Sequence, residues 1–356
     1  MTERVYLDWN ATAPLRPEAR AAVVAAMDAV GNPSSVHAEG RAARAIVERA
    51  RDQVAALLGC RPGEVVFTSG ATEAAGMLEM VPEGHDVYVQ DTAHDCLMAH
   101  VRMGGAAEGG HTLAWGLANG ETGVIAEPPG KAEDGYPFGA RRADWLLLDV
   151  AQAAGRIPFA FSWSGADLAI VSAHKLGGPK GVGALIVRDG LDIAPLQTGG
   201  GQEKGRRSGT ENVAGIAGFG AAAEAALRDL DAGVWAGVAE LRDGLEARIA
   251  AAAPETIFVG RGAPRLPNTS CLLTRGWKGE TQVMQMDLAG FAVSAGSACS
   301  SGKVRTSRVL SAMGYDDAAA GSAIRVSLGP TTRQEEIDGF ASAWIEAEAR
   351  FRARAA

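Results

Sequence analysis

Apolar residues recur along the chain in two patterns, and each pattern predicts a different kind of element. At Pro17–Val30 and Ala38–Leu58 they return every three or four positions, which is the period of an amphipathic helix. Beyond them come short continuous apolar runs, which are typical of buried strands. We expect strands at Glu64–Thr68, Asp86–Gln90, His111–Trp115, Trp145–Val150, Leu168–Ser172 and Val182–Val187.

Helical segments separate several of these strands. One begins at about Thr72, another runs through Val101, and longer ones cover roughly 211–252. Alternating strands and helices favour a mostly parallel sheet with helices on both faces. Beyond Pro254 the order changes to strand, strand, helix, strand, helix, strand, helix. We therefore expect a large domain at 15–253 and a small domain formed by 254–356 together with residues 1–14.

Composition and charge narrow the class of protein. A chain of 356 residues exceeds the size at which one hydrophobic core usually stops growing, which supports two domains. A net charge of −8 argues against a general nucleic-acid binder, because phosphate binding requires a basic face. No segment is long and apolar enough to cross a bilayer, and the first residues do not read as a secretory signal. We therefore expect a cytoplasmic protein.

The four cysteines do not form a metal or disulfide pattern. Cys60, Cys96, Cys271 and Cys299 contain no C-x-x-C pair, and a large chain without a signal is not expected to use disulfides. Cys96 lies between two histidines, at positions 94 and 100, so a metal site is conceivable. Nothing else supplies a matching ligand set, and we expect no metal.

A carboxylate stands at the end of one apolar run. Asp149 follows Trp145–Leu148. An ionised group at the end of a buried strand needs a cationic partner, because burial of a lone charge is costly. A protonated pyridine ring would serve as that partner. The alternative is that Asp149 caps a helix, and this motif alone does not decide between them.

A lysine ends the next apolar run. Leu168–Val171 leads to Lys175, which precedes a Gly-Gly-Pro turn. Strand ends in α/β sheets are where ligands bind, and a desolvated lysine there can become a Schiff-base nucleophile. A surface lysine in a turn is the ordinary alternative. Lys180 is a competing candidate, but it lies within the turn and is more typical of a surface residue or a neighbour of a phosphate.

Small residues open the helix that follows the strand Glu64–Thr68. The run Phe67–Glu73 contains Ser69, Gly70, Ala71 and Thr72. Free backbone N–H groups at a helix start attract anions, and phosphate is the anion most often expected there. A plain helix cap remains the alternative.

Two further candidates are a cysteine in a run of small residues and an arginine in an apolar run. Cys299 lies in the run Val293–Gly302 of small residues, which favours a loop whose thiol is used for its reactivity. Arg325 is the one charged residue of the apolar run Ser322–Gly329. A bidentate grip on a substrate carboxylate is the usual purpose of such an arginine. A carboxylate of the protein itself is an equally ordinary partner.

These motifs occur together and in this order in the cysteine desulfurases, which the chain resembles over nearly its whole length. The runs Tyr6–Pro14, Gly31–Ser35 and Arg207–Thr210 are also similar to motifs of that family. The family belongs to the class V aminotransferase group of fold-type-I pyridoxal-phosphate enzymes, and the cysteine run resembles the branch typified by NifS and IscS. The resemblance implies an α/β large domain with a mostly parallel seven-stranded sheet flanked by helices, and a smaller α+β C-terminal domain.

The resemblance also implies a role for each candidate residue. Lys175 should hold pyridoxal 5'-phosphate as a Schiff base, Asp149 should pair with the ring nitrogen, and Gln152 should contact the ring hydroxyl. His94 should stack on the ring and assist proton transfer. Arg325 and Asn32 should bind the substrate. The residues implied around the phosphate are Ala71, Thr72, Ser172, His174 and, from a neighbouring subunit, Thr210.

The implied reaction converts L-cysteine to L-alanine and leaves a persulfide on Cys299. That sulfur passes to an acceptor protein, for which iron–sulfur cluster assembly, tRNA thiolation and cofactor synthesis remain open. The implied assembly is a homodimer, with no membrane and no direct nucleic acid as partners. The alternatives are another class V enzyme, such as a selenocysteine lyase or a small-amino-acid lyase or aminotransferase, and a non-catalytic homologue.

The chain departs from the family pattern at two positions. The family's Asn-Asn-Glu motif appears as Asn119-Gly120-Glu121, so the second asparagine, which should touch the cofactor, is a glycine. Asn119 could replace it after a small backbone shift. A neutral hydrogen bond contributes about 0.5–1.5 kcal/mol net, which tunes activity without abolishing it. The histidine that often follows the glycines of the basic loop is Gln202.

Overall fold

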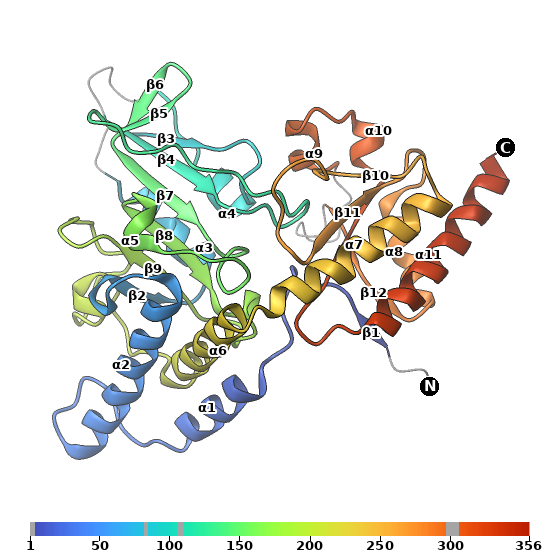
Figure 1. Ribbon diagram of the computed structural model, residues 1–356. Coiled ribbons are helices and arrows are strands. Elements are labelled where there is room, and N and C mark those ends of the chain that lie inside the picture. Colours follow the sequence, from blue (N-terminus) through green and yellow to red (C-terminus); the bar gives the residue numbers. More distant parts are fainter. Residues whose placement is uncertain (1–3, 82–84, 105–109, 297–305, 356) are drawn as a thin grey trace. The chain divides into compact units, whose positions relative to one another are not determined.

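The computed structural model describes residues 4–81, 85–104, 110–296 and 306–355, and it divides into two compact units (Figure 1). The large unit contains residues 12–118 and 126–231. The small unit contains residues 1–11, 119–125 and 232–356. These bounds differ from the expected domains at three places: residues 119–125 and 232–253 belong to the small unit, and residues 12–14 belong to the large unit. Cys299 lies outside the described residues.

The large unit is built on a six-stranded mixed sheet with the order β2-β9-β8-β7-β4-β3. Its strands are β2 (Val65–Thr68), β3 (Asp86–Val89), β4 (His111–Gly116), β7 (Trp145–Asp149), β8 (Leu168–Ser172) and β9 (Gly183–Val187). Strands β3, β4, β7 and β8 run parallel to one another, whereas β9 is antiparallel to both β8 and β2. The expected α/β class with a mostly parallel sheet is confirmed.

The expected number of seven strands is wrong for the described part of this sheet. Beyond β3 the sheet continues only as an isolated antiparallel bridge between Val87 and Arg102. Gly104 then adopts a φ of +102°, which lies outside the extended region that a strand requires. A single bridge therefore replaces a full edge strand.

Helices cover both faces of the large-unit sheet. The helices of this unit are α1 (Pro17–Met27), α2 (Ala38–Leu58), α3 (Ala71–Ala75), α4 (Asp95–Met98), α5 (Phe161–Ser164) and α6 (Val213–Asp231). Residues of α3 and α4, such as Ala74 and Leu97, share a buried cluster with Val66 of β2. The next residue of β2, Phe67, meets Phe219 of α6 with ring centroids 6.2 Å apart. Alternate residues of one strand thus face opposite helical layers.

Local sequence explains where the long helix α2 begins and ends. The side chain of His37 accepts a hydrogen bond from the Gly40 backbone N–H, which caps the first turn. Gly59 ends the helix with φ of +59°, a left-handed conformation that glycine adopts without a steric penalty. A short hairpin that the sequence pattern did not indicate, β5 (Tyr136–Phe138) with β6 (Arg141–Ala143), precedes β7.

The small unit has a four-stranded antiparallel sheet with the order β10-β11-β14-β13, and β1 pairs with β12 in parallel. The strands are β1 (Val5–Tyr6), β10 (Ile257–Phe258), β11 (Thr269–Leu273), β12 (Phe291–Ala292), β13 (Ser294–Ala295) and β14 (Ala323–Ser327). The helices are α7 (Val234–Ala252), α8 (Gly279–Leu288), α9 (Arg308–Ala312), α10 (Asp317–Ala320) and α11 (Gln334–Ala355). Helix α11 packs against α7 and α8. Among the described helices, none combines the length and the apolar composition needed to span a membrane.

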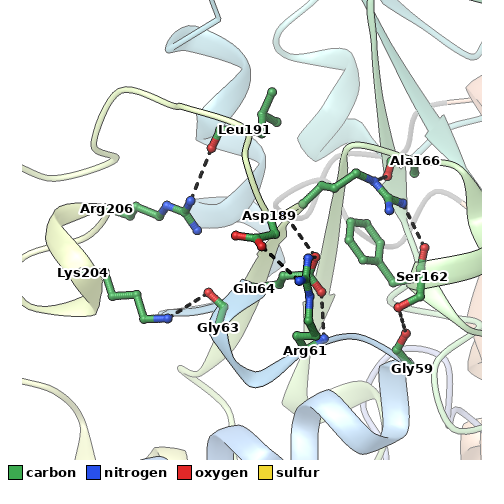
Figure 2. A network of polar contacts seen from close by, with 12 residues as sticks. Gly59, Arg61, Gly63, Glu64, Ser162, Ala166, Asp189, Leu191, Lys204 and Arg206 are labelled. Atoms are coloured by element: carbon green, nitrogen blue, oxygen red, sulfur yellow. Dashed lines mark hydrogen bonds and ion pairs between the residues drawn. The ribbon is translucent and has the colours of Figure 1, made fainter.

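A network of polar contacts fixes the turns around the glycine-rich loop at 199–209 (Figure 2). Glu64, which is buried, accepts hydrogen bonds from the backbone N–H groups of Arg61 and Asp189. Lys204 donates to the Gly63 carbonyl at 3.1 Å, and Arg206 donates to the Leu191 carbonyl at 3.3 Å. The loop is therefore tied to the segment before β2 and to the segment after β9.

A buried ion pair links the same loop to α2. Arg51 of α2 donates two hydrogen bonds of 2.8 Å to the carboxylate of Glu203, which also accepts the Phe67 backbone N–H. Both side chains are buried, and the pKa of Arg51 is raised by its hydrogen bond and charge interaction with Glu203 although burial acts against it. Glu203 adopts a φ of +48°, an uncommon conformation for a residue with a side chain. The ion pair thus stabilises a strained turn.

Removing one partner of this pair is expected to be strongly destabilising. Glu203→Ala leaves the buried Arg51 without its main counter-charge, so the free energy of unfolding should fall by about 3–5 kcal/mol. Glu48→Ala is the matched control, because Glu48 is a half-exposed partner of the same arginine and should contribute less than about 1 kcal/mol. Urea unfolding measures both values. Equal losses in the two variants would contradict this assignment.

Candidate active site

The carboxyl ends of β7 and β8 bring the two central candidate residues to one edge of the large-unit sheet. Asp149 is the last residue of β7, and its register partner on the parallel strand β8 is Ile170. Lys175 lies three residues beyond the end of β8, in a single 3₁₀ turn at Ala173–Lys175. Ligands of α/β proteins bind at this end of parallel strands. The two residues that the sequence singled out therefore share the expected edge.

The side chain of Asp149 is partly buried, and positive charge lies near it. Its Oδ1 atom accepts a hydrogen bond of 2.9 Å from the Ala151 backbone N–H. Burial raises the pKa of its carboxyl, while that hydrogen bond and the charges of His94 and Lys175 act in the opposite direction. A carboxylate with a raised pKa is stabilised by a further cation. The site therefore suits a positively charged ring nitrogen.

Arg156 fixes the backbone around Lys175. Its buried guanidinium donates a 3.0 Å hydrogen bond to the Lys175 carbonyl and a second, short one to the Gln152 side chain. Gln152 follows Asp149 by three residues and is half-buried. One arginine thus links the segments after β7 and β8 and sets the positions of Gln152 and Lys175. Arg156 is not among the residues predicted from the sequence, although a charged residue among Ala153, Ala154 and Ile157 indicates burial with a partner.

His174 is held as a neutral ring. Its Nδ1 atom lies 3.2 Å from the Thr12 hydroxyl. Burial, followed by the positive charges of Lys175, Lys180 and Arg156, lowers the pKa of His174 from 6.5 to about 4. A neutral imidazole beside Ser172 offers one N–H donor, which suits an oxygen-rich ligand.

The low pKa of His174 predicts a pH dependence of stability. Between pH 6.5 and about 4 the unfolded chain binds a proton on this histidine and the folded chain does not, so stability should fall as the pH falls through that range. His174→Gln removes the titrating group and should make the free energy of unfolding of the apoprotein less steep between pH 7 and 4.5. Urea titrations across that range measure the slope. Identical slopes for both proteins would refute the assignment.

His94 caps α4 and presents an exposed ring. Its Nδ1 atom accepts a hydrogen bond of 3.1 Å from the Cys96 backbone N–H, so the neutral ring carries its proton on Nε2. His100 contacts Glu79 at 2.6 Å. Within the described ranges, no group of three or more His, Cys, Asp or Glu side chains is placed to hold a metal ion.

The start of α3 lies close to the end of β8 and the start of β9. Ser172 is buried at the end of β8, and a Cβ on Gly70 would lie 4.0 Å from its hydroxyl oxygen. A Cβ on Gly183 would lie 2.7 Å from the Gly70 Cα, so the backbone here needs glycine for its close approach. Ala71 and Thr72 open the helix directly after Gly70, and Thr72 is exposed. The structure thus groups Ala71, Thr72, Ser172 and His174 at the carboxyl edge of the sheet.

Thr210 lies at the end of the braced glycine-rich loop. Gln202 accepts a hydrogen bond of 3.0 Å from the Gly209 backbone N–H, and Arg207 pairs with Glu73 of α3 at 2.8 Å. Glu73 also accepts the Ser69 backbone N–H at 2.7 Å. Thr210 itself is exposed. Its loop is therefore linked to the turn that precedes Ala71 and Thr72.

The substrate-binding candidates have partners within the protein. Arg325 in β14 is buried, and its terminal nitrogens donate to the Asp8 carboxylate at 2.6 Å and to the Gly120 carbonyl at 3.0 Å. Its Nε atom is buried without a hydrogen-bond partner. Asn32 of the large unit is exposed and accepts the Ser34 backbone N–H within a turn. Substrate binding by Arg325 and Asn32 stays a prediction.

Asn119 and Gly120, where the chain departs from the family's Asn-Asn-Glu motif, both take part in hydrogen bonds within the small unit. Asn119 uses its Oδ1 atom to accept the backbone N–H groups of Glu121 and Thr122, each at 2.9 Å. Asn119 therefore closes a turn of the small unit. The Gly120 carbonyl accepts hydrogen bonds from Asn10 and Arg325, both at 3.0 Å. Asn119 thus stabilises the turn through hydrogen bonds to neighbouring residues, and these bonds do not involve a cofactor.

Three comparisons place the chain among known proteins. The aminotransferase class-V family matches residues 5–102 and 139–340. A cysteine desulfurase of Enterobacter agglomerans is 37% identical, covering 94% of this chain and 90% of the relative. An IscS-like cysteine desulfurase of Mycobacterium tuberculosis is 34% identical, covering 98% of this chain and 97% of the relative.

The solved structures agree with the sequence relatives. A NifS-like protein from Rickettsia africae superposes with a TM-score of 0.82 at 27% identity, covering 98% of this chain and all of that one. Another NifS-like protein gives a TM-score of 0.83 at 28% identity, covering 97% and 99%. The resemblance that the motifs predicted is thereby confirmed over nearly the whole length. The chain belongs to the class-V aminotransferase family.

Proposed function

We propose that the chain is a pyridoxal-phosphate-dependent cysteine desulfurase that converts L-cysteine to L-alanine. The observation that carries the proposal is the placement of Asp149 and Lys175 at the carboxyl ends of adjacent parallel strands. The names of the relatives point to the same activity, and the family's cofactor fits the donors present. Burial raises the pKa of Asp149, and a cationic ring nitrogen beside it would act in the opposite direction.

Each part of the cofactor would meet residues of one edge of the large-unit sheet. Lys175 would hold it covalently, Asp149 would pair with the ring nitrogen, and Gln152 would bind the ring hydroxyl. His94, exposed with a proton on Nε2, would cover the ring. The phosphate would be held by Ala71, Thr72, Ser172 and His174, and by Thr210 of the partner subunit in a homodimer. When bound, the group supplies an electron sink for carbanions at the substrate Cα atom.

The chain's own residues then move protons and sulfur. The Lys175 Nζ atom takes the proton from the substrate Cα atom and returns it later. Arg325, already aligned by Asp8, binds the substrate carboxylate, with Asn32 as a second contact. The Cys299 thiolate attacks the substrate sulfur; an S–S bond forms and the Cβ–S bond breaks, with its electron pair left on the substrate. A proton, equivalent to the one lost when the Cys299 thiol ionised, is then added to Cβ, and alanine leaves. The products are alanine and a Cys299 persulfide, so atoms and electrons balance without another reactant.

The persulfide then passes to a sulfur-acceptor protein. We place this transfer in the cytoplasm and expect iron–sulfur cluster assembly to be one consumer of the sulfur. The acceptor is defined by its chemistry, a thiol that takes the terminal sulfur of a persulfide. Incubating the ³⁵S-persulfide form with a cell extract and isolating the labelled protein would identify it.

Asp149→Asn tests the proposed site. An amide cannot balance a positive charge on the ring nitrogen, so the electron sink is weakened and kcat should fall by about 10²–10⁴-fold. Cofactor should still bind, because Lys175 and the phosphate contacts remain. Alanine and sulfide are measured with cysteine and a reductant, and cofactor content is measured by absorbance. An unchanged kcat would rule Asp149 out as the ring partner.

A substrate panel tests the activity itself. The purified wild-type protein should be yellow and should form alanine from cysteine in preference to other small amino acids. Preference for selenocysteine, or transamination without sulfide, would assign a different class-V reaction. Colourless protein that fails to bind added cofactor would refute the proposal.

A further inference from the structure

Arg156 is a buried arginine whose place in the large unit is set by the turn that follows β7. The Arg156 and Ile157 backbone N–H groups both donate to the Ala153 carbonyl, at 3.0 and 3.1 Å, which closes that turn. The residue before it, Gly155, adopts a φ of +73°, and a Cβ there would lie 2.8 Å from the Cβ atom of Ala226 in α6. The turn therefore packs directly against α6, and Arg156 is only 3% exposed.

Two acceptors from different segments meet the Arg156 guanidinium. Its Nη1 atom donates to the Oε1 atom of Gln152, and its Nη2 atom donates to the Lys175 carbonyl at 3.0 Å. A guanidinium is planar and presents its N–H groups in a fixed fork, so one orientation of the side chain serves both acceptors. The two hydrogen bonds therefore fix the Gln152 amide relative to the main chain of Lys175.

The contact with Arg156 also decides which end of the Gln152 amide faces the guanidinium. A guanidinium has N–H donors and no acceptor, so the amide has to turn its oxygen toward it. The flipped amide would place an N–H2 group against another donor, which is unfavourable. Gln152 therefore directs its amide nitrogen away from Arg156, and at that end it meets a ligand as a hydrogen-bond donor.

A donor at this end of Gln152 suits an ionised oxygen. The cofactor of the proposed function carries a ring hydroxyl, which Gln152 would bind. An N–H donor stabilises the ionised form of such an oxygen, whereas a carbonyl oxygen in its place would stabilise the protonated form. The orientation of this one amide thus determines which form of the ring oxygen the protein favours.

The charge of Arg156 has a separate effect on the same site. Burial is the largest cause of the lowered pKa of His174, and the charge of Arg156 adds to it. The charged groups that shift the pKa values of His174 and Asp149 are Lys175, Lys180, Arg156 and His94. Removing Arg156 therefore changes both the amide orientation and the local charge, and an experiment has to separate the two.

We propose that Arg156 is a positioning residue that orients the Gln152 amide so that its N–H2 group stabilises the ionised ring oxygen of bound pyridoxal 5'-phosphate. The inference rests on the proposed function, which places the cofactor beside Gln152. Arg156 itself touches neither cofactor nor substrate in this account and acts through Gln152. Without Arg156 the amide can present either end to the ring oxygen, so that oxygen becomes more basic.

Arg156→Gln and Arg156→Lys test the orientation in the yellow protein. A glutamine side chain both donates and accepts, so it no longer fixes the Gln152 amide, whereas a lysine side chain only donates and keeps the positive charge. The ring oxygen and the Schiff-base nitrogen share one proton, and its loss changes the cofactor absorbance. A more basic oxygen holds that proton to higher pH. The midpoint of the absorbance change should therefore rise by about one pH unit in Arg156→Gln, and by less than about half a unit in Arg156→Lys.

A double-mutant cycle separates the amide from the charge. Gln152→Leu alone should raise the midpoint, because the donor is lost. Arg156→Gln should add little to the midpoint in the Gln152→Leu background, since it acts through that amide. Arg16→Gln is the matched control, because the Arg16 side chain donates at 2.9 Å to the Leu176 carbonyl, the carbonyl next to that of Lys175. The control should keep the wild-type midpoint.

Any of four outcomes would overturn the inference. The first is an unchanged midpoint in Arg156→Gln. The second is a rise in the Gln152→Leu background as large as in the wild type, which would assign the effect to charge alone. The third is an equal rise in Arg16→Gln, which would assign it to a loosened turn. The fourth is a rise of a full unit or more in Arg156→Lys, which tests the inference even if Arg156→Gln does not fold.

A failure of the proposed function would look different. The wild-type protein would then be colourless and would not bind added pyridoxal 5'-phosphate, so no midpoint could be measured in any variant. A yellow wild-type protein with any of the four outcomes above would keep the proposed function and remove only the role of Arg156.

Discussion

Cys299→Ala should lose alanine formation from cysteine while retaining the cofactor absorbance of the wild-type protein. In the proposed mechanism this thiolate accepts the substrate sulfur, and no other atom of that mechanism can take it. Removing a catalytic nucleophile commonly lowers kcat by about 10³-fold or more. Cofactor binding depends on residues of the large unit and should not change. The measurement is alanine release at saturating cysteine, alongside the absorbance spectrum.

Cys60→Ala is the matched control for this experiment. Cys60 is half-buried, and burial together with the charge of Glu64 raises the pKa of its thiol to about 12. A thiol with that pKa stays protonated at neutral pH and is a poor nucleophile. The control should therefore keep wild-type turnover. Full turnover in Cys299→Ala would remove this cysteine from its role and would call for another sulfur acceptor.

Lys175→Ala should lower alanine formation as strongly as Cys299→Ala, but for a different reason. The variant cannot form the Schiff base and has no amine to move the Cα proton, so kcat should fall by at least about 10²–10⁴-fold, the contribution of general acid–base catalysis alone. Cofactor should be held only by the ring and phosphate contacts and should be lost on dialysis. Absorbance before and after dialysis, together with alanine release, measures both effects.

Lys180→Ala separates the two lysines of the Gly-Gly-Pro turn. Lys180 is exposed, and its charge contributes to lowering the pKa of His174. Its removal should leave the Schiff base intact and change turnover by a few-fold at most, since an exposed charge contributes about 0–1 kcal/mol. A loss of the cofactor in this variant, with Lys175→Ala unaffected, would reverse the assignment of the two residues.

The large-unit strands and their chemistry were largely predictable from local sequence. The apolar run Leu168–Ser172 became β8 with the same bounds, and the periodic run Ala38–Leu58 became α2 with the same bounds. Asp149 and Lys175 follow such runs directly, so parallel pairing alone brings them to one edge. Local sequence patterns are enough to predict a candidate site residue when it lies at the end of a strand or just after it.

Contacts between distant residues were not predictable in this way. Arg325 meets Asp8 across 317 positions, and Glu121 meets Ser307 across 186 positions. No local period indicates such pairs, because tertiary packing decides them. The segment around Glu121 was assigned to the large domain for the same reason: it lies between two large-unit strands in the sequence, yet it packs with the small unit.

The identity of the cofactor lysine is the most direct test of the account. Borohydride reduction of the yellow protein, followed by proteolysis and mass spectrometry, fixes the cofactor on whichever lysine carries it. The account predicts a phosphopyridoxyl mass on the peptide containing Lys175. The same mass on the Lys180 side chain, or on no lysine of the chain, would contradict it.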